Sequence, residues 1–383
     1  MAKDIIKLGD VATYINGYAF KPEDRGEEGL QIIRIQDLTG NSYDLGFYNG
    51  KYPKKIEIND GDVLISWSAS LGVYVWNGGK ALLNQHIFKV KFDKVDIDKS
   101  YFVYAVRYKL NDMGKKTHGA TMKHIVKRDF DATEIPYPPL KKQIEIAINL
   151  DKVLMVIKER KRELKLLDEL IKARFVEMFG DITTGNYKYD TRKLGDVANV
   201  GSSHRVFTTE FVKKGIPFYR GTEIGELANG NKPTEPFYIS EEHYNRLVYN
   251  DTKPQVGDLL LPSICNKGQV WMVDTDEPFY YKDGRVLCIS PDREIFDTKY
   301  LEYFMKAKTL VEYPKLGSGS TFAEFKIFLL KDIDVLIPPR ELQEQFSIFV
   351  NQVDKSKFDT MTFAPIYAII NLYLHTYFYQ GRR

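Results

Sequence analysis

An internal repeat constrains this chain more than any other feature of its sequence. Three landmarks recur in the same order, at offsets of 186, 196 and 200 residues, which drift as loop insertions would make them drift. They are Lys7-Leu8-Gly9-Asp10-Val11-Ala12 with Lys193-Leu194-Gly195-Asp196-Val197-Ala198, Gly61-Asp62-Val63-Leu64-Ile65 with Gly257-Asp258-Leu259-Leu260-Leu261, and Pro138-Pro139 with Gln143 followed by Pro338-Pro339 with Gln343. A duplicated unit of about half the chain predicts two similar domains, and two similar surfaces can bind two similar objects.

Length and composition are those of a globular protein with two cores. The 383 residues are 43% hydrophobic and 28% charged, and the net charge is only +3. The N-terminus lacks an apolar run with a basic flank, so we expect no signal peptide. Two cysteines 23 residues apart, Cys265 and Cys288, do not form a disulfide framework or a zinc motif. We therefore expect a cytoplasmic protein without metal or other cofactors.

The predicted fold is mixed α/β (α+β), with a pseudo-twofold repeat. Residues 1–139 and 181–339 form the two similar domains. Within the first domain, Val63–Ile65 and Ile87–Val90 are typical strands, Tyr101–Leu110 has helical periodicity, and Asn77-Gly78-Gly79 is a turn signal. Many short strands suggest a curved sheet with helices packed outside it.

A long helix is predicted directly after each domain. Residues 140–179 contain no proline or glycine, and apolar residues recur at alternating steps of three and four until Gly180 ends the helix. The segment 340–383 holds the second helix, with Phe346, Val350 and Val353 on its seam, and then a tail. We expect the two helices to form an antiparallel coiled-coil pair, with Leu150, Val153 and Ile157 facing Val350 and Val353. The alternative is that each helix docks on its own domain.

The tail breaks the symmetry of the repeat. Residues 361–379 are aromatic and apolar and nearly long enough for a membrane span. Pro365, Asn371 and His375 disfavour a span. We expect instead a separate segment that covers the helices or a partner subunit.

The ordered set of landmarks resembles the specificity subunits of type I restriction-modification systems. The resemblance rests on the two Lys-Leu-Gly-Asp-Val copies, the two Gly-Asp strands and the two proline turns running into Gln143 and Gln343. The stretch Glu163–Gly180 is similar to that family's central helix, whereas the tail from about Asp359 departs from the family's second long helix.

The resemblance implies a non-catalytic subunit that binds double-stranded DNA. Each target-recognition domain would read one half of a split site, and the helices would set the unread gap. The partners would be two modification subunits, which methylate adenine with S-adenosylmethionine, and restriction subunits that use ATP.

Catalytic motifs are missing independently of the resemblance. Neither Tyr137-Pro138-Pro139-Leu140 nor Ile337-Pro338-Pro339-Arg340 matches the Asn/Asp-Pro-Pro-Tyr/Phe loop that an adenine methyltransferase needs. There is no Gly-Lys-Ser/Thr phosphate loop. Pro291-Asp292 and Glu324-Phe325-Lys326 match a nuclease pattern that is short enough to arise by chance.

Candidate DNA contacts recur at matched positions. Phosphate binding needs cations and backbone amides, and base reading needs polar side chains. The candidates form three pairs of segments: Lys115, Lys116, His118, Thr121 and Lys123 with Lys315, Ser318, Ser320 and Thr321; Ser66, Trp67 and Ser68 with Asn266 and Lys267; and Arg34 and Gln36 with Arg220 and Thr222. The alternatives are plain turns, a core role for Trp67 and a solvated charged face, and buried salt bridges would explain the arginines equally well.

Two other function classes stay open at this point. One is a protein scaffold that holds two copies of a partner without reading DNA, and the other is a catalytic restriction or methylation enzyme. Basic residues at matched positions favour DNA over the scaffold, and the missing motifs oppose the enzyme.

Overall fold

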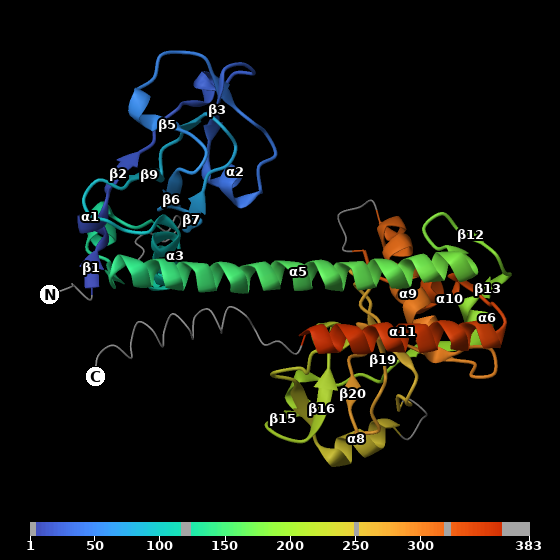
Figure 1. The fold of residues 1–383 in the computed structure, drawn as a ribbon. Helices are drawn as coiled ribbons and strands as arrows, with labels where there is room; N and C mark the ends of the chain where they lie inside the picture. The colour runs from blue at the N-terminus through green and yellow to red at the C-terminus, as the bar shows by residue number, and fades with distance from the viewer. Residues whose placement is uncertain (1–4, 116–123, 249–252, 318–322, 362–383) are drawn as a thin grey trace. The chain divides into compact units, whose positions relative to one another are not determined.

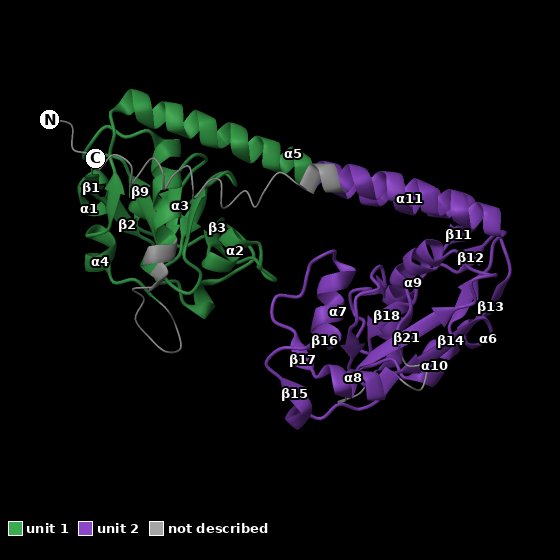
Figure 2. Cartoon of the chain, turned by 90° about the horizontal axis from the view of Figure 1, so that it is seen from below, with its two compact units in different colours: residues 1–161, 363–383 green, residues 162–362 purple. Residues whose placement is uncertain are grey.

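The computed structural model describes residues 5–115, 124–248, 253–317 and 323–361. Contacts divide the chain into two compact units, described over residues 5–161 (unit 1) and 162–361 (unit 2), as Figure 2 shows. Helix α5 (Leu140–Phe179) is one continuous helix that begins in unit 1 and ends in unit 2 (Figure 1). The forty-residue helix expected from the sequence is thus confirmed.

Unit 1 contains two four-stranded sheets, with strand orders β2-β9-β6-β7 and β4-β3-β8-β5, and a two-stranded ribbon of β1 and β10. Its strands are β1 (Ile5–Lys7), β2 (Thr13–Asn16), β3 (Leu30–Ile33), β4 (Phe47–Tyr48), β5 (Glu57–Ile58), β6 (Val63–Ser66), β7 (Gly72–Val75), β8 (Ala81–Leu83), β9 (Ile87–Lys91) and β10 (Glu134–Pro136). Its other helices are α1 (Leu8–Val11), α2 (Ile35–Thr39), α3 (Lys99–Lys115) and α4 (Lys127–Asp131).

Unit 2 repeats this plan, with sheet orders β14-β21-β18-β19 and β15-β17-β16-β20, a ribbon of β13 and β22, and a short hairpin of β11 and β12. Its strands are β11 (Gly180–Asp181), β12 (Asn186–Tyr187), β13 (Thr191–Lys193), β14 (Ala198–Ser202), β15 (Phe211–Val212), β16 (Ile216–Tyr219), β17 (Phe237–Ile239), β18 (Leu259–Pro262), β19 (Trp271–Met272), β20 (Tyr280–Tyr281), β21 (Val286–Pro291) and β22 (Asp334–Leu336). Its helices are α6 (Leu194–Val197), α7 (Gly221–Ala228), α8 (Glu241–Leu247), α9 (Thr298–Glu312), α10 (Ile327–Lys331) and α11 (Arg340–Met361).

The strand pairings confirm that the sequence repeat is a repeat of topology. The second sheet of each unit has one parallel pair, β3 with β8 in unit 1 and β16 with β20 in unit 2. The ribbon between the start and the end of each domain also recurs, with Ile5 opposite Pro136 and Thr191 opposite Leu336.

The Lys-Leu-Gly-Asp-Val-Ala motif recurs because its glycine packs against a neighbouring helix. A Cβ atom at Gly9 would lie 2.9 Å from the Asp131 Cβ at the end of α4, and one at Gly195 would lie 2.9 Å from the Lys331 Cβ at the end of α10. Any larger residue would push the two elements apart. The Gly-Asp landmark has a conformational cause, since Gly61 and Gly257 have φ values of +85° and +86° that favour glycine.

The glutamine after each Pro-Pro turn fastens the helix that follows. Gln143 is buried, accepts the Asp98 N–H at 2.9 Å and donates to the Pro138 carbonyl at 2.8 Å. Gln343 is buried in the same way, accepts the Asp297 N–H at 2.9 Å, and donates to the carbonyls of Ile295 and Pro338. These bonds fix the start of α5 against α3, and the start of α11 against α9.

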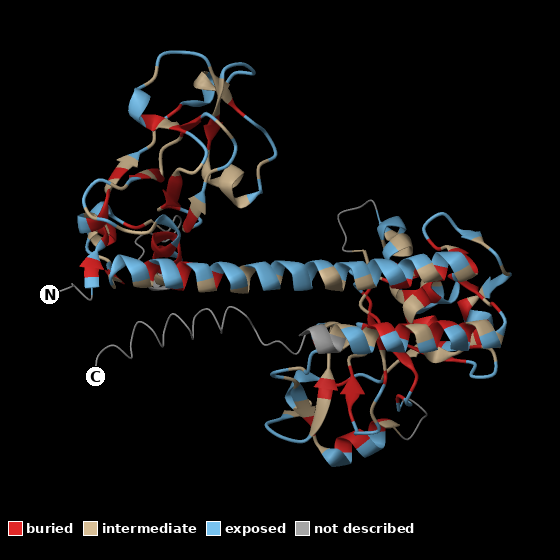
Figure 3. Ribbon diagram, in the orientation of Figure 1, coloured by how far each residue is buried: buried red, intermediate tan, exposed pale blue. Residues whose placement is uncertain are grey.

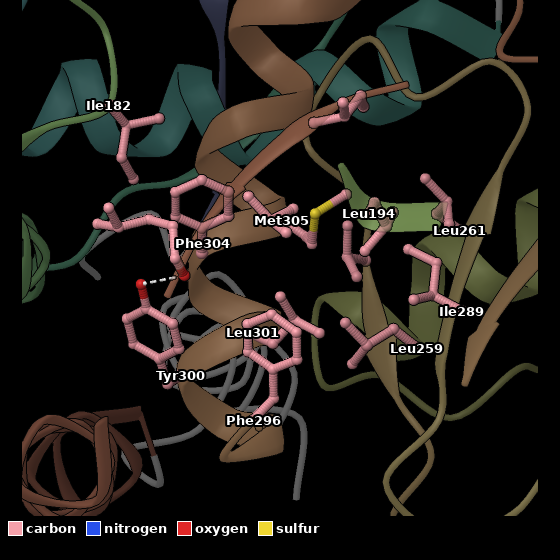
Figure 4. Close-up of a cluster of buried hydrophobic side chains, with 14 of the residues drawn as sticks. Ile182, Leu194, Leu259, Leu261, Ile289, Phe296, Tyr300, Leu301, Phe304 and Met305 are labelled. Atoms are coloured by element: carbon pink, nitrogen blue, oxygen red, sulfur yellow. Dashed lines mark hydrogen bonds between the residues drawn. The ribbon is translucent and has the colours of Figure 1, made fainter. Parts of the chain in front are cut away.

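Helix α11 packs antiparallel against the last turns of α5, inside unit 2. Phe346 contacts the rings of Phe175 and Phe179 at 5.4 and 5.6 Å, and Lys357 pairs with Asp168 at 2.7 Å. Figure 4 shows other members of the same core, with Met305 of α9 directed toward Leu194 and Phe304 on the side of Ile182. The antiparallel pairing expected from the sequence is confirmed.

The expected register of that pair was wrong. Val350 and Val353 lie in the core that includes Ile171 and Phe175, whereas Leu150 lies in the unit 1 core with Ile146. The reason is geometric: α11 starts next to the end of α5, and its 22 residues extend only about 33 Å. Side chains along the middle of α5 are exposed (Figure 3), Met155 at 61% and Leu166 at 53%.

Candidate nucleic-acid interface

The loop after the Gly-Asp strand is held by the same two backbone hydrogen bonds in both units. In unit 1, the Trp67 N–H donates to the His86 carbonyl (3.1 Å) and the Ile125 N–H donates to the Trp67 carbonyl (3.0 Å). In unit 2, the Ser263 N–H donates to the Arg285 carbonyl (2.9 Å) and the Phe325 N–H donates to the Ser263 carbonyl (2.7 Å).

We call this arrangement the repeated corner. It comprises residues 66–70, 86 and 124–125 in unit 1, and residues 263–267, 285 and 324–325 in unit 2. Two of the three candidate segments meet there, because His124 and Glu324 follow the basic segment of their unit within a few residues. In unit 2 the third segment is also adjacent, since a Cβ at Gly221 would lie 3.1 Å from the Pro262 Cβ and 4.0 Å from the Arg285 carbonyl oxygen.

The unit 1 corner is aromatic. The Trp67 ring stacks on Phe88 at 5.7 Å and meets the edge of His86 at 4.9 Å, and its indole N–H donates to Asn16 at 3.3 Å. Ser66 and Ser68 are buried, and Ser66 donates to the Ser70 carbonyl at 2.5 Å. Trp67 is therefore partly a core residue, with its polar edge on Asn16.

Backbone strain also marks the unit 1 corner. Ala69 and His86 are the two non-glycine residues of the described chain with positive φ, at +55° and +71°. Residues other than glycine rarely adopt a positive φ, and residues with a strained backbone concentrate at functional sites.

The unit 2 corner is ionic. Asn266 and Lys267 are exposed, and the side chains of Arg285 and Glu324 form an ion pair at 2.7 Å. Glu324 also pairs with Lys326 and lies 3.4 Å from the Ser263 hydroxyl. The hydrogen bond from Lys326 lowers the pKa of the Glu324 carboxyl, and the charge of Arg285 acts in the same direction. The carboxylate is therefore ionised at neutral pH.

The two matched arginines are both tied to a carboxylate three residues later, but they differ in exposure. The Arg34 side chain is 13% exposed and pairs with Asp37 and Asp44, each at 3.2 Å. The Arg220 side chain is 42% exposed, pairs with Glu223 at 2.5 Å and lies 4.4 Å from the Phe237 ring centroid.

Their neighbouring candidates differ in the same way. The Gln36 amide lies 3.0 and 3.1 Å from two Arg34 nitrogens and, with its oxygen turned toward them, accepts two hydrogen bonds. Thr222 is exposed in the first turn of α7. The polar groups of Arg34 and Gln36 are thus largely hydrogen-bonded within unit 1, whereas Arg220 and Thr222 are more accessible to solvent.

The remaining candidates belong to the basic segments. Lys115 is the last residue of α3, and Lys315 is 61% exposed and pairs with Glu312 at 3.0 Å. Seven candidates lie outside the described residues: Lys116, His118, Thr121, Lys123, Ser318, Ser320 and Thr321.

Sequence reasoning missed the side chains at positions 86, 124 and 285 and the role of Glu324. The signal was available, because aligning the repeat places His86 with Arg285 at an offset of 199 and His124 with Glu324 at an offset of 200. Only the hydrogen bonds of the corner show that each pair flanks one loop.

A known protein family matches each copy of the repeat. The chain matches the family model of the type I restriction modification DNA specificity domain twice, over residues 3–166 and 186–366. The chain therefore belongs to this family and is a DNA specificity subunit of a type I restriction-modification system, a non-catalytic part of that complex. The alternatives of a scaffold without DNA and of a catalytic enzyme do not fit this membership.

The sequence similarity to individual relatives extends over most of their length. The chain is 23% identical to the type I restriction enzyme EcoBI specificity subunit of Escherichia coli over 373 residues, covering 90% of this chain and 77% of that one. It is also 23% identical to the MjaVIII specificity subunit of Methanocaldococcus jannaschii over 376 residues, covering 92% and 86%.

Two solved structures have a similar fold. One is the type I restriction-modification S subunit from M. genitalium, with a TM-score of 0.56 at 14% identity over 97% of this chain and 94% of that chain. The other comes from work on complex assembly and conformational transition of the type I R-M system, with a TM-score of 0.56 at 17% identity over 98% and 97%.

No helix in the described part of the chain is long and apolar enough to cross a membrane. The aromatic tail that raised this question lies outside the described residues, apart from Met361 at the end of α11.

Proposed function

We propose that each unit reads one half of a bipartite double-stranded DNA target, and that α5 with α11 sets the length of the unread gap. The observation that carries this proposal is the repeated corner. Two equivalent loops are held by equivalent hydrogen bonds, but they carry different polar side chains. Two loops with the same backbone arrangement but different side chains are suited to two half-sites of different sequence.

The candidate contacts divide into two kinds. The lysines of the basic segments and Lys267 would bind phosphates, which supplies affinity without sequence information. The side chains of the corner, together with Arg220 and Thr222, would approach base edges. Arg34 and Gln36 would support their loop more than contact DNA, because their polar groups are already paired.

The partners follow from the same repeat. Two similar units joined by α5 offer two similar surfaces, and hence room for two modification subunits. Restriction subunits would join them in the full complex, in the cytoplasm. Exposed apolar side chains along α5, Met155, Val156 and Leu166 among them, are suited to contact with such subunits.

The experiment that tests this function is a map of adenine methylation in the host, with and without the gene. We expect the loss of one bipartite motif when the gene is removed. An unchanged methylation map would contradict the proposal.

The spacing role can be tested separately by inserting four residues near Arg160, where α5 is exposed. One added turn lengthens the helix by about 6 Å, which corresponds to one or two base pairs at about 3.4 Å each. The gap should lengthen while both half-sites stay the same. An active variant with the original gap would refute the spacing role.

A further inference from the structure

The strongest unassigned feature of the molecule is the pair of side chains that flanks the corner loop. The shared backbone bonds make Arg285 equivalent to His86, and make Glu324 equivalent to His124. In unit 1, an additional bridge between Ser68 and His124 holds His124 beside the loop. The repeat thus keeps the position of the pair and changes its chemistry.

In unit 2 the pair holds an arginine in a defined orientation. The Arg285 Nη1 donates to the Glu324 Oε2 at 2.7 Å, and the Glu324 side chain is only 20% exposed. This is the one side-chain hydrogen bond that Arg285 makes within the described part of the chain. A guanidinium has five N–H donors in a fixed fork, so most of them remain directed elsewhere. The side chain is 61% exposed and can therefore reach a ligand.

The surroundings of Arg285 suit an anionic polymer. Lys267 lies in the corner loop itself, and Lys326 directly follows Phe325, whose N–H donates to that loop. Both lysines are exposed, so the corner carries more positive charge than Glu324 neutralises. The start of α7, with Arg220 and Thr222, approaches the Arg285 backbone through Gly221. An arginine that reads a nucleobase binds better when its side chain is already held in place, because an unrestrained side chain would lose conformational entropy on binding.

We propose that Arg285, oriented by Glu324, is a specificity-determining residue of unit 2 that reads a guanine in the major groove. This inference rests on the proposed function and deepens it. An arginine fork matches the O6 and N7 acceptors of guanine, and no other base pair presents that pattern. Unit 1 has two histidines at these positions, and a neutral imidazole offers one donor and one acceptor instead of a fork. The two units therefore read different half-sites.

The test compares Arg285→Ala and Arg285→Lys with a matched control, Arg246→Ala, which removes an exposed arginine of α8 in the same unit. Each variant is assembled with the modification subunits. Its Kd is measured for the methylated motif of the native complex, for each single-base change of that motif, and for an unrelated duplex. Melting temperatures verify that the variants are folded.

We expect Arg285→Ala to weaken binding of the cognate duplex about 10- to 100-fold and to abolish discrimination at one G·C pair of one half-site. Binding of the unrelated duplex should change less than about threefold. Arg285→Lys should also lose the discrimination, because a single ammonium cannot form the fork. Arg246→Ala should leave both affinities within about twofold.

Two results would overturn the assignment: equal weakening of cognate and unrelated duplexes, which marks a phosphate contact, or unchanged discrimination in both Arg285 variants. A native complex that prefers no duplex sequence would instead refute the proposed function itself.

Discussion

Units 1 and 2 share the same backbone arrangement, but they differ in the helices that pack on it and in the side chains of the repeated corner. The buried glutamine, the ribbon of first and last strands and the corner hydrogen bonds recur. Unit 1 packs on the start of α5, whereas unit 2 packs on the end of α5 and on α11. The corner of unit 2 contains an ion pair, whereas the corner of unit 1 contains stacked aromatic rings. The repeat thus preserves the bonds that position the loop, while the side chains that the corner carries differ between the units.

The largest expected effect concerns the separate cores. Phe346 in unit 2 and Ile146 in unit 1 occupy equivalent helix positions, and both are fully buried. Phe346→Ala should cost about 3–5 kcal/mol, because it removes a ring that contacts Phe175, Phe179 and Tyr303. Ile146→Ala should cost about 2–5 kcal/mol.

Hydrogen exchange checks where the destabilisation falls. Faster exchange should be confined to α9, α11 and the end of α5 for Phe346→Ala, and to α3 and the start of α5 for Ile146→Ala. Exchange that rises equally in both units for either variant would show that the two cores are not independent.

A smaller effect separates the two matched arginines. Replacing Arg34 by Met leaves Asp37 without its cation, whereas Asp44 keeps its ion pair with Arg25. Because the Asp37 side chain is only 5% exposed, we expect a loss of about 2–3 kcal/mol. Replacing Arg220 by Met should cost less, about 1–2 kcal/mol: Glu223 is also only 5% exposed, but Arg220 is 42% exposed and its pair is partly screened by solvent. DNA binding should show the opposite order. Thermal unfolding and duplex affinity measured on both variants check this, and equal losses in both assays would remove the distinction.

The smallest expected effect concerns phosphate contacts. Replacing Lys115, Lys116 and Lys123 by Ala should weaken binding to all duplexes similarly, and should flatten the salt dependence by about one unit of slope per lost contact. Lys315→Ala in unit 2 should change the slope less, because Lys315 is already paired with Glu312. Affinities measured across a salt series decide this. An unchanged slope in the triple variant would reject the basic segment as a phosphate contact.

Much of the fold could be predicted from the sequence, because the repeat and the turn residues are local signals. The expected helix 140–179 agrees with α5, and the expected strands at Val63 and Ile87 agree with β6 and β9. Gly61 and Gly257 marked the repeat in the sequence, and their shared backbone conformation explains why glycine recurs there.

The rest depends on contacts between residues distant in the chain. Periodicity shows that α5 and α11 have apolar seams, but not which turns meet, and the register was therefore wrong. Arg285 and Glu324 are 39 residues apart, and they meet only because both flank the Ser263 loop. The engagement of Arg34 likewise depends on Asp44, in a different turn of unit 1.

Whether each unit reads its own half-site can be decided by mapping methylated motifs for one corner variant of each unit. Trp67→Ala alters the corner of unit 1, and the double change Asn266→Ala with Lys267→Ala alters that of unit 2. Each complex is expressed in a host without the native gene, and its methylated sites are compared with those of the native complex. The account predicts that each variant relaxes one half of the motif, that the two variants relax opposite halves, and that the gap stays the same. Relaxation of the same half by both variants, or of both halves by either one, would contradict the account.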